Sequence, residues 1–217
     1  MSRNVIEILA EGHGEAGPSI RGSEPAATVL VSRLLHHLGH SHELFATRTP
    51  LRMRSVGEFY RADVLEKRLR YLAQRDRCAA VLILLDMDDG CPTERARELG
   101  ERVRAMLPLP FSTVIVAAKR EYEAWFLASL ESIHEGEAYP GDPESLRDAK
   151  GWLRKRYRYR PTSQQSEYTR RIDIKLAASR SRSFRRMLHA VDEIVTAYRE
   201  GIQVVTPALG DSKDSLT

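Results

Sequence analysis

The chain has 217 residues, a formal net charge of +4, 42% hydrophobic and 29% charged residues, which suits one domain with an elaboration and a buried core. No apolar run approaches the roughly 20 residues that a membrane span requires, and no signal-peptide pattern is present, so we expect no membrane segment. Cys78 and Cys91 form neither a disulfide framework nor a zinc quartet, which predicts a reducing, cytoplasmic setting.

The first predicted strand, Val5–Ala10, leads directly into a glycine-rich segment. Residues 12–17 formally spell G-x-G-x-x-G, a pattern typical of dinucleotide-binding sites. Glu11 and Glu15 would place two negative charges where the phosphates of such a cofactor lie, which disfavours that interpretation. We interpret the two acids as metal ligands and keep a nucleotide-binding enzyme as the less favoured alternative.

Strands and helices alternate along the following hundred residues. The expected strands are 42–47, 79–85 and 112–117, and the expected helices are 26–38, 60–73, 93–106 and one that begins at 124. Together with the first strand, this alternation predicts an α/β fold with a mostly parallel four-stranded sheet and helices on both faces.

The strand Ala79–Leu85 is an unbroken apolar run that ends in Asp86, Asp88 and Asp89. Such a run predicts a central strand that is buried on both faces. In extended backbone Asp86 and Asp88 would project to the same side, where their charges repel one another unless a hard divalent cation offsets them. The alternative is that these acids are turn and cap residues ahead of the helix Thr93–Met106.

Three of the four predicted strands are followed by acidic residues. A parallel sheet brings the carboxyl ends of its strands to one edge, and ligands bind outside that edge. We therefore expect these side chains to gather into one metal site. The acids are Glu11 and Glu15 after the first strand, Asp86, Asp88 and Asp89 after the third, and Glu121 and Glu123 after the fourth.

The composition changes beyond the loop Glu135–Pro143, which we take as a domain boundary. We expect an α/β metal-binding domain over residues 1–134, a basic all-helical C-terminal extension over 142–200 and a disordered tail over 206–217. Asp142 and Pro143 suit the start of its first helix, and residues 150–186 contain thirteen Lys or Arg against two acids.

Such a charge run often marks a solvated helix face. Beside an acidic metal site, however, cations with interleaved tyrosines also fit a phosphate backbone and its bases. The candidate nucleic-acid-binding residues are Arg154, Lys155, Arg156, Arg158, Arg160, Lys175, Arg182 and Arg185.

Five segments of the chain resemble one known family. They read EGHGE, LLDMDDGCP, AKREYEAWFLASLESI, RDAKGWL and RIDIKLAASRSRSFRRM, and they extend from about Val5 to Val191. In order and spacing they are similar to the bacterial family catalogued as domain of unknown function 4276. That family resembles a branch of the TOPRIM-like superfamily, which also includes the overcoming-lysogenization-defect nucleases.

The resemblance implies a TOPRIM-like nuclease in which an E-G-x-x-E element and a D-x-D element hold Mg²⁺ or Mn²⁺. These elements fall on Glu11, Glu15, Asp86 and Asp88, and a further catalytic acid or lysine would be among Lys119, Glu121 and Glu123. It also implies a role in bacterial defence against phage beside a partner ATPase, and we keep a homodimer as one candidate assembly. The alternative is a non-catalytic module that binds nucleic acid or an ATPase.

Overall fold

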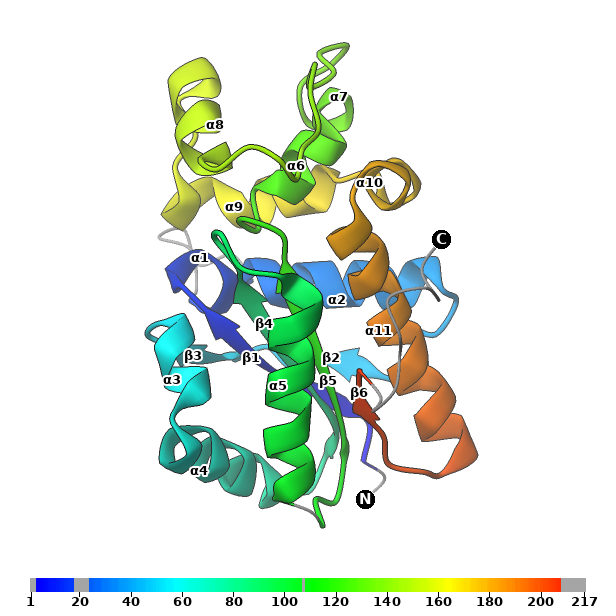
Figure 1. Ribbon diagram of the computed structural model, residues 1–217. Helices are drawn as coiled ribbons and strands as arrows, with labels where there is room; N and C mark the ends of the chain where they lie inside the picture. The colour runs from blue at the N-terminus through cyan, green and yellow to red at the C-terminus, as the bar shows by residue number, and fades with distance from the viewer. Residues whose placement is uncertain (1–2, 18–23, 107, 208–217) are drawn as a thin grey trace.

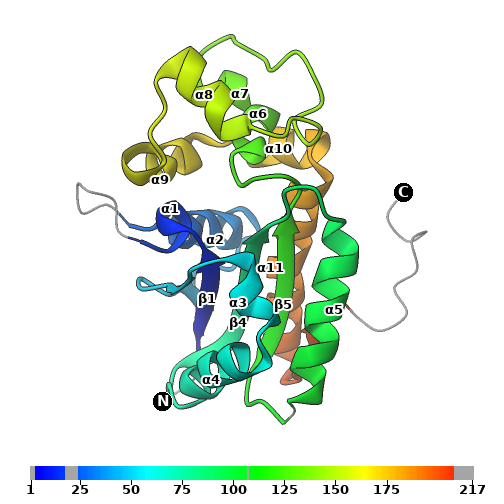
Figure 2. The same cartoon turned by 60° about the vertical axis from the view of Figure 1, so that its left-hand side comes forward.

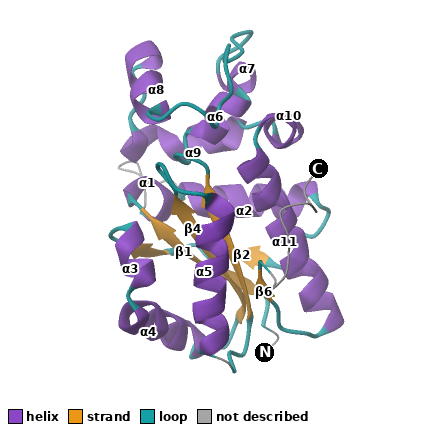
Figure 3. Cartoon of the chain, in the orientation of Figure 1, coloured by secondary structure: helices purple, strands orange, loops and turns teal. Residues whose placement is uncertain are grey.

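The computed structural model describes residues 3–17, 24–106 and 108–207, and a parallel β-sheet lies at its centre (Figures 1 and 3). The sheet has the strand order β2-β1-β4-β5-β6, and β3 pairs with the same edge of β1 as β2. Every pairing is parallel. The strands are β1 (Val5–Glu11), β2 (Phe45–Ala46), β3 (Leu51–Met53), β4 (Cys78–Asp86), β5 (Ser112–Ala118) and β6 (Val205–Thr206).

The sequence prediction of four strands is wrong in number. Six strands are described in the sheet, because Leu51–Met53 pairs with the last residues of β1 and Val205–Thr206 pairs with β5. Both added strands are only two or three residues long, so they carry too little periodic pattern to be recognised in the sequence. The mostly parallel α/β architecture with helices on both faces is confirmed.

Helices cover both faces of the sheet, and the sheet separates the core into two parts (Figures 1 and 2). Alternate residues of β1 and β4 face opposite parts: Ile8 and Leu82 belong to one, and Leu9 and Ile83 to the other. One face carries α2 (Ala26–His37) and α11 (Arg182–Glu200), and the other carries α3 (Val56–Tyr60), α4 (Ala62–Ala73) and α5 (Pro92–Ala105).

Five short helices lie beyond the carboxyl ends of the strands, and we call residues 124–180 the helical cap (Figure 2). An aromatic cluster joins the cap to the segment that follows β5, since the ring of Phe126 lies 5.5 Å from that of Tyr122 and 5.9 Å from that of Tyr159, a second ring of the cap. The cap helices are α6 (Ala124–Ala128), α7 (Leu130–Ile133), α8 (Ala149–Tyr157), α9 (Pro161–Arg171) and α10 (Ile174–Arg180).

The structure does not show residues 142–200 as a helical extension apart from the sheet. The longest helix of this region, α11, packs against β5 and α2. Its apolar stripe, which includes Phe184 and Val191, shares one core with Ile6 and Leu82. An amphipathic stripe of this length needs an apolar partner, and the face of the sheet provides it. Residues 208–217 of the expected tail lie outside the described residues.

The first helix of this region also begins later than expected. Asp142 accepts a hydrogen bond from the amide of Glu144 within a turn, whereas Asp148 accepts one from the amide of Gly151 at 2.7 Å and caps α8. None of the helices in the described part of the chain is long and apolar enough to cross a membrane.

Replacing Phe184 by Ala tests whether α11 belongs to the main core. Phe184 is fully buried and packs edge-on against Trp125 with 5.5 Å between ring centroids. We expect F184A to lower the free energy of unfolding in urea by about 3–5 kcal/mol. The control R185A changes the exposed neighbouring residue and should stay within about 0.5 kcal/mol of the wild type. Equal, small effects of both variants would contradict this packing.

Candidate metal centre at the carboxyl edge of the sheet

Two acids stand at the ends of neighbouring central strands. Glu11 is the last residue of β1 and Asp86 is the last residue of β4. Oε1 of Glu11 accepts a hydrogen bond from the amide of Val56 at 3.0 Å, and Oδ1 of Asp86 accepts one from the amide of Tyr122 at 2.9 Å. The backbone around the strand ends therefore holds both carboxylates in place.

Glu15 lies on the helical turn α1 (His13–Ala16), directly after β1, and is only 7% exposed. Gly12 before it has a φ of +87°, and a Cβ there would lie 2.2 Å from Oε2 of Glu15. Only glycine can adopt this backbone conformation at no steric cost and leave room for the carboxylate. The first glycine of the motif thus makes space for an acid of this chain.

Glu121 and Glu123 follow β5 and point toward the helical cap. Oε2 of Glu121 accepts a hydrogen bond from the backbone amide of Lys150 at 2.9 Å. Glu123 is fully buried, and its Oε1 accepts hydrogen bonds from the hydroxyl of Tyr159 at 3.0 Å and from Nε2 of Gln165 at 3.4 Å. Sequence analysis did not single out Tyr159, Gln165 or Lys150 as partners of these acids.

Lys150, at the start of α8, contributes a positive charge to this site. Its Nζ lies 3.7 Å from Oε2 of Glu123 and 3.9 Å from Oε1 of Glu121. Burial acts to lower the pKa of the Lys150 ammonium, but the nearby carboxylates, Glu123 above all, outweigh it and raise the pKa. Lys150 therefore stays protonated and offsets part of the negative charge.

Burial raises the pKa of four carboxyl groups at this edge. It is the largest cause for Glu11, Glu15, Asp86 and Glu123, and the pKa of Glu123 rises from 4.5 to about 7. The groups also raise one another's pKa values: the charges of Glu15, Glu123 and Glu11 all act on Asp86. The structure therefore gathers these four acids into one cluster of mutually repelling groups, the carboxylate cluster.

Three buried oxygens of this region have no hydrogen-bond partner within the described residues. They are Oε2 of Glu11, Oε2 of Glu123 and Oε1 of Gln165. Buried polar atoms in folded proteins almost always have a partner, and exceptions point to a missing water or ion. As the side chains stand, no three Asp, Glu, His or Cys residues in the described ranges are arranged to hold a metal ion together.

Asp88 does not lie beside Asp86 as extended backbone would place it. Strand β4 ends at Asp86, and Asp88 is exposed in the following turn with a φ of +37°. Its amide donates to the carbonyl of Arg120 at 3.0 Å, while the Asp89 carboxylate forms ion pairs with Arg120 and Arg147. The expectation of a same-side pair is therefore wrong, although the charge of Asp88 still acts on Glu11.

Lys119 directly follows β5 and is half-buried. Its ammonium forms no hydrogen bond or ion pair with any residue that the structure describes, so the structure does not bring it to the carboxylates. Lys150, 31 residues further along the chain on α8, stands near them instead.

The eight basic residues proposed to bind nucleic acid are all exposed. They do not form one strip, because α8 and α10 lie on opposite sides of the helical cap in Figure 1. The interleaved tyrosines are engaged elsewhere: Tyr157 stacks on His134 at 3.6 Å, and Tyr159 is fully buried. These two rings are therefore not free to stack on bases, which corrects that part of the sequence interpretation.

Sequence signals for Lys150 and Gln165 are weak. Lys150 lies in the segment RDAKGWL, where one lysine follows a short acidic loop. Gln165 is one of two adjacent glutamines on a polar helix, and nothing in the spacing shows which of them faces inward. Both approach the acids only through tertiary packing, because 150 residues separate Gln165 from Glu15.

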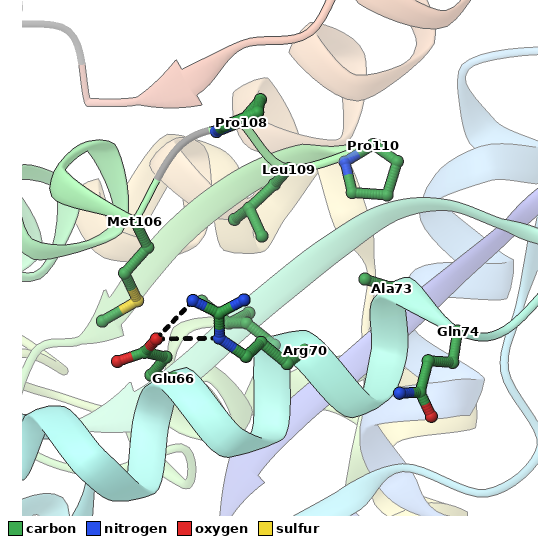
Figure 4. A pocket seen from close by; sticks show the side chains of 9 residues that line it. Glu66, Arg70, Ala73, Gln74, Met106, Pro108, Leu109 and Pro110 are labelled. Carbon is green, nitrogen blue, oxygen red and sulfur yellow. Dashed lines mark hydrogen bonds and ion pairs between the residues drawn. The ribbon is translucent and has the colours of Figure 1, made fainter.

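A cavity of about 220 Å³ lies at the opposite edge of the sheet (Figure 4). It is formed by α4 and the segment that follows α5, and the Glu66–Arg70 ion pair lies on its wall at 2.7 Å. The cavity lies beside the amino ends of β4 and β5, whereas the carboxylate cluster lies at the carboxyl ends of the strands.

Residues 22–192 match the family described as Domain of unknown function (DUF4276). The chain belongs to this family. The matched region includes Asp86, Glu123, Lys150 and Gln165 but begins after Glu11 and Glu15. Comparisons with curated proteins and with solved structures found no match.

The carboxylate cluster predicts a specific pH dependence of stability. Between about pH 4.5 and 7, folded Glu123 holds a proton that the unfolded chain releases, so its contribution to stability is lost as the pH rises. Glu123→Gln removes the charge. We subtract the free energy of unfolding of the wild type from that of the variant, and we expect this difference to be up to about 3 kcal/mol larger at pH 8 than at pH 5.

Urea unfolding at the two pH values measures this difference. The control Glu167→Gln changes an exposed acid on α9 and should show no such gain. If the difference in stability between E123Q and the wild type is the same at pH 5 and pH 8, ionisation of Glu123 does not destabilise the folded protein.

Proposed function

We propose that this protein is a divalent-cation-dependent phosphodiesterase that hydrolyses nucleic acid, and that its sheet is TOPRIM-like. The observation that supports this most is the gathering of four mutually repelling carboxyl groups, two buried and two half-buried, at the carboxyl edge of three adjacent strands. Burying such groups together is costly unless a bound positive charge offsets it. Strongly raised pKa values in one place are also typical of functional sites.

The donor set fits a hard cation. All candidate ligands are oxygens, which suits Mg²⁺ or Mn²⁺ and disfavours softer metals. Oε2 of Glu11 and Oε2 of Glu123 are buried and accept no hydrogen bond from the described residues, although the Lys150 ammonium lies 3.7 Å from Oε2 of Glu123. Both oxygens are therefore candidate cation ligands. Glu11, Asp86 and Glu123 would hold the cation, with Glu15 nearby, and at least one of these side chains must rotate to do so. The exposed Asp88 would contribute only through its charge, which acts on Glu11.

A cation bound there would supply a Lewis acid that polarises a phosphoryl oxygen and lowers the pKa of bound water. The residues of the chain have separate tasks. The amides of Val56 and Tyr122 orient Glu11 and Asp86. Lys150 adds a fixed positive charge beside Glu123, which favours the charge that develops on a phosphate in the transition state.

The exposed basic residues of α8, α10 and α11 would attract the phosphate backbone of the substrate. Because each neutralised phosphate releases counterions, binding should weaken steeply as salt rises. A partner ATPase and a role in defence against phage stay predictions from the family resemblance.

A non-catalytic module is the second candidate function. The observation that favours it is the enclosure of Glu15 and Glu123 by the cap, where both accept hydrogen bonds from Gln165. A carboxylate held in this way could serve structure alone. Stable binding of nucleic acid without any turnover would distinguish this function from the first.

The test of the proposed activity is cleavage of plasmid, single-stranded DNA and tRNA with Mg²⁺ or Mn²⁺. We expect cleavage of at least one of these, and a loss on the order of 100-fold or more in Asp86→Asn, because this variant loses a charged metal ligand. The control Asp63→Asn changes an exposed acid on α4 and should cut as the wild type does. If the wild type cleaves none of these substrates, or if D86N keeps full activity, the proposal is wrong.

A further inference from the structure

Gln165 of the helical cap lies between two acids of the carboxylate cluster. It is 1% exposed, and its Nε2 donates to Oε1 of Glu15 at 2.6 Å and to Oε1 of Glu123 at 3.4 Å. The other end of the same amide, Oε1, is buried and has no hydrogen-bond partner among the described residues. One amide thus satisfies two carboxylates while its own oxygen stays unsatisfied.

The position of Gln165 is firmly fixed. Its backbone carbonyl accepts a hydrogen bond from Oγ1 of Thr169 at 2.7 Å, and Thr169 also contacts the hydroxyl of Tyr122 at 3.1 Å. Arg33 of α2 donates to the carbonyls of Thr169 and Ile172 at 2.5 and 2.7 Å, which ties α9 to α2. The amide therefore cannot leave the carboxylates without a larger movement of the cap.

A buried amide oxygen without a hydrogen-bond partner destabilises the folded protein. A cation bound to this oxygen would supply the missing partner, because side-chain amide oxygens are ordinary ligands of hard divalent ions. Once a bound cation offsets the charges of Glu15 and Glu123, the two carboxylates no longer depend on hydrogen bonds from the amide N–H groups. Turning the amide about its last bond then directs the oxygen toward them.

We propose that Gln165 is a cation ligand of this site: its amide N–H groups hold Glu15 and Glu123 in the metal-free protein, and its oxygen binds the cation that enters between them. This inference rests on the proposed cation site and adds a ligand from the helical cap. It makes the cap part of the site, so that cation binding and the packing of α9 against α1 and α2 are coupled.

Two substitutions separate this role from a purely structural one. Gln165→Leu removes both the donor and the oxygen, whereas Gln165→Glu removes the donor and keeps an oxygen ligand. If the amide served only as a donor to the two carboxylates, both variants would weaken cation binding alike. If its oxygen is a ligand, only the leucine variant should lose affinity.

The measurement is calorimetric titration of the purified full chain with MnCl₂ at pH 8, with thermal unfolding of each variant as a check of folding. We expect Gln165→Leu to bind Mn²⁺ about 10–100-fold more weakly than the wild type, the range typical for losing a supporting group of a metal site. Gln165→Glu should bind at least as tightly as the wild type. The control Gln164→Leu replaces the adjacent glutamine of α9, whose Oε1 accepts a hydrogen bond from the amide of Arg160, and should leave the affinity unchanged.

The outcomes are distinguishable. Wild-type affinity in Gln165→Leu, or equally weak binding in both Gln165 variants, would overturn the ligand role while leaving the cation site intact. No Mn²⁺ binding by the wild type would overturn both this inference and the proposed function. If Gln165→Leu does not fold, Gln165→Glu decides alone, since affinity below that of the wild type contradicts the proposal.

Discussion

Repulsion among buried carboxylates is the constraint on which this structure depends. Glu11, Glu15, Asp86 and Glu123 come from three different parts of the chain and meet at one edge of the sheet, where burial and their neighbours raise their pKa values. The charge of Lys150 acts on three of them and offsets only part of the repulsion. A fold retains such a costly arrangement only when packing elsewhere outweighs it, and it typically does so at a functional site.

The sheet and the helical cap have different parts in this arrangement. The ends of β1 and β4 carry Glu11 and Asp86, which stay half-buried, whereas the cap encloses Glu15 and Glu123 and supplies their hydrogen-bond donors. Aromatic packing of Phe126 on Tyr122 joins the cap to the segment that follows β5. A substrate phosphate would therefore reach the carboxylate cluster from the side of Glu11 and Asp86.

The sequence predicts the sheet better than the site. The long apolar runs of β4 and β5 identify central parallel strands, and the acids that follow them identify the edge at which the carboxylates gather. Short edge strands leave no such pattern, and the place where β4 ends decides that Asp88 turns away from Asp86. Lys150 and Gln165 join the acids through contacts across long stretches of chain, which periodicity and local spacing do not encode.

The central claim is that the carboxylate cluster is a cation site. Its most direct test is a crystal structure of the protein grown with MnCl₂ at pH 8, with diffraction data collected at the manganese absorption edge. The account predicts an anomalous peak enclosed by carboxylate oxygens of Glu11, Asp86 and Glu123. An ordered carboxylate cluster with no anomalous peak among these side chains would contradict it.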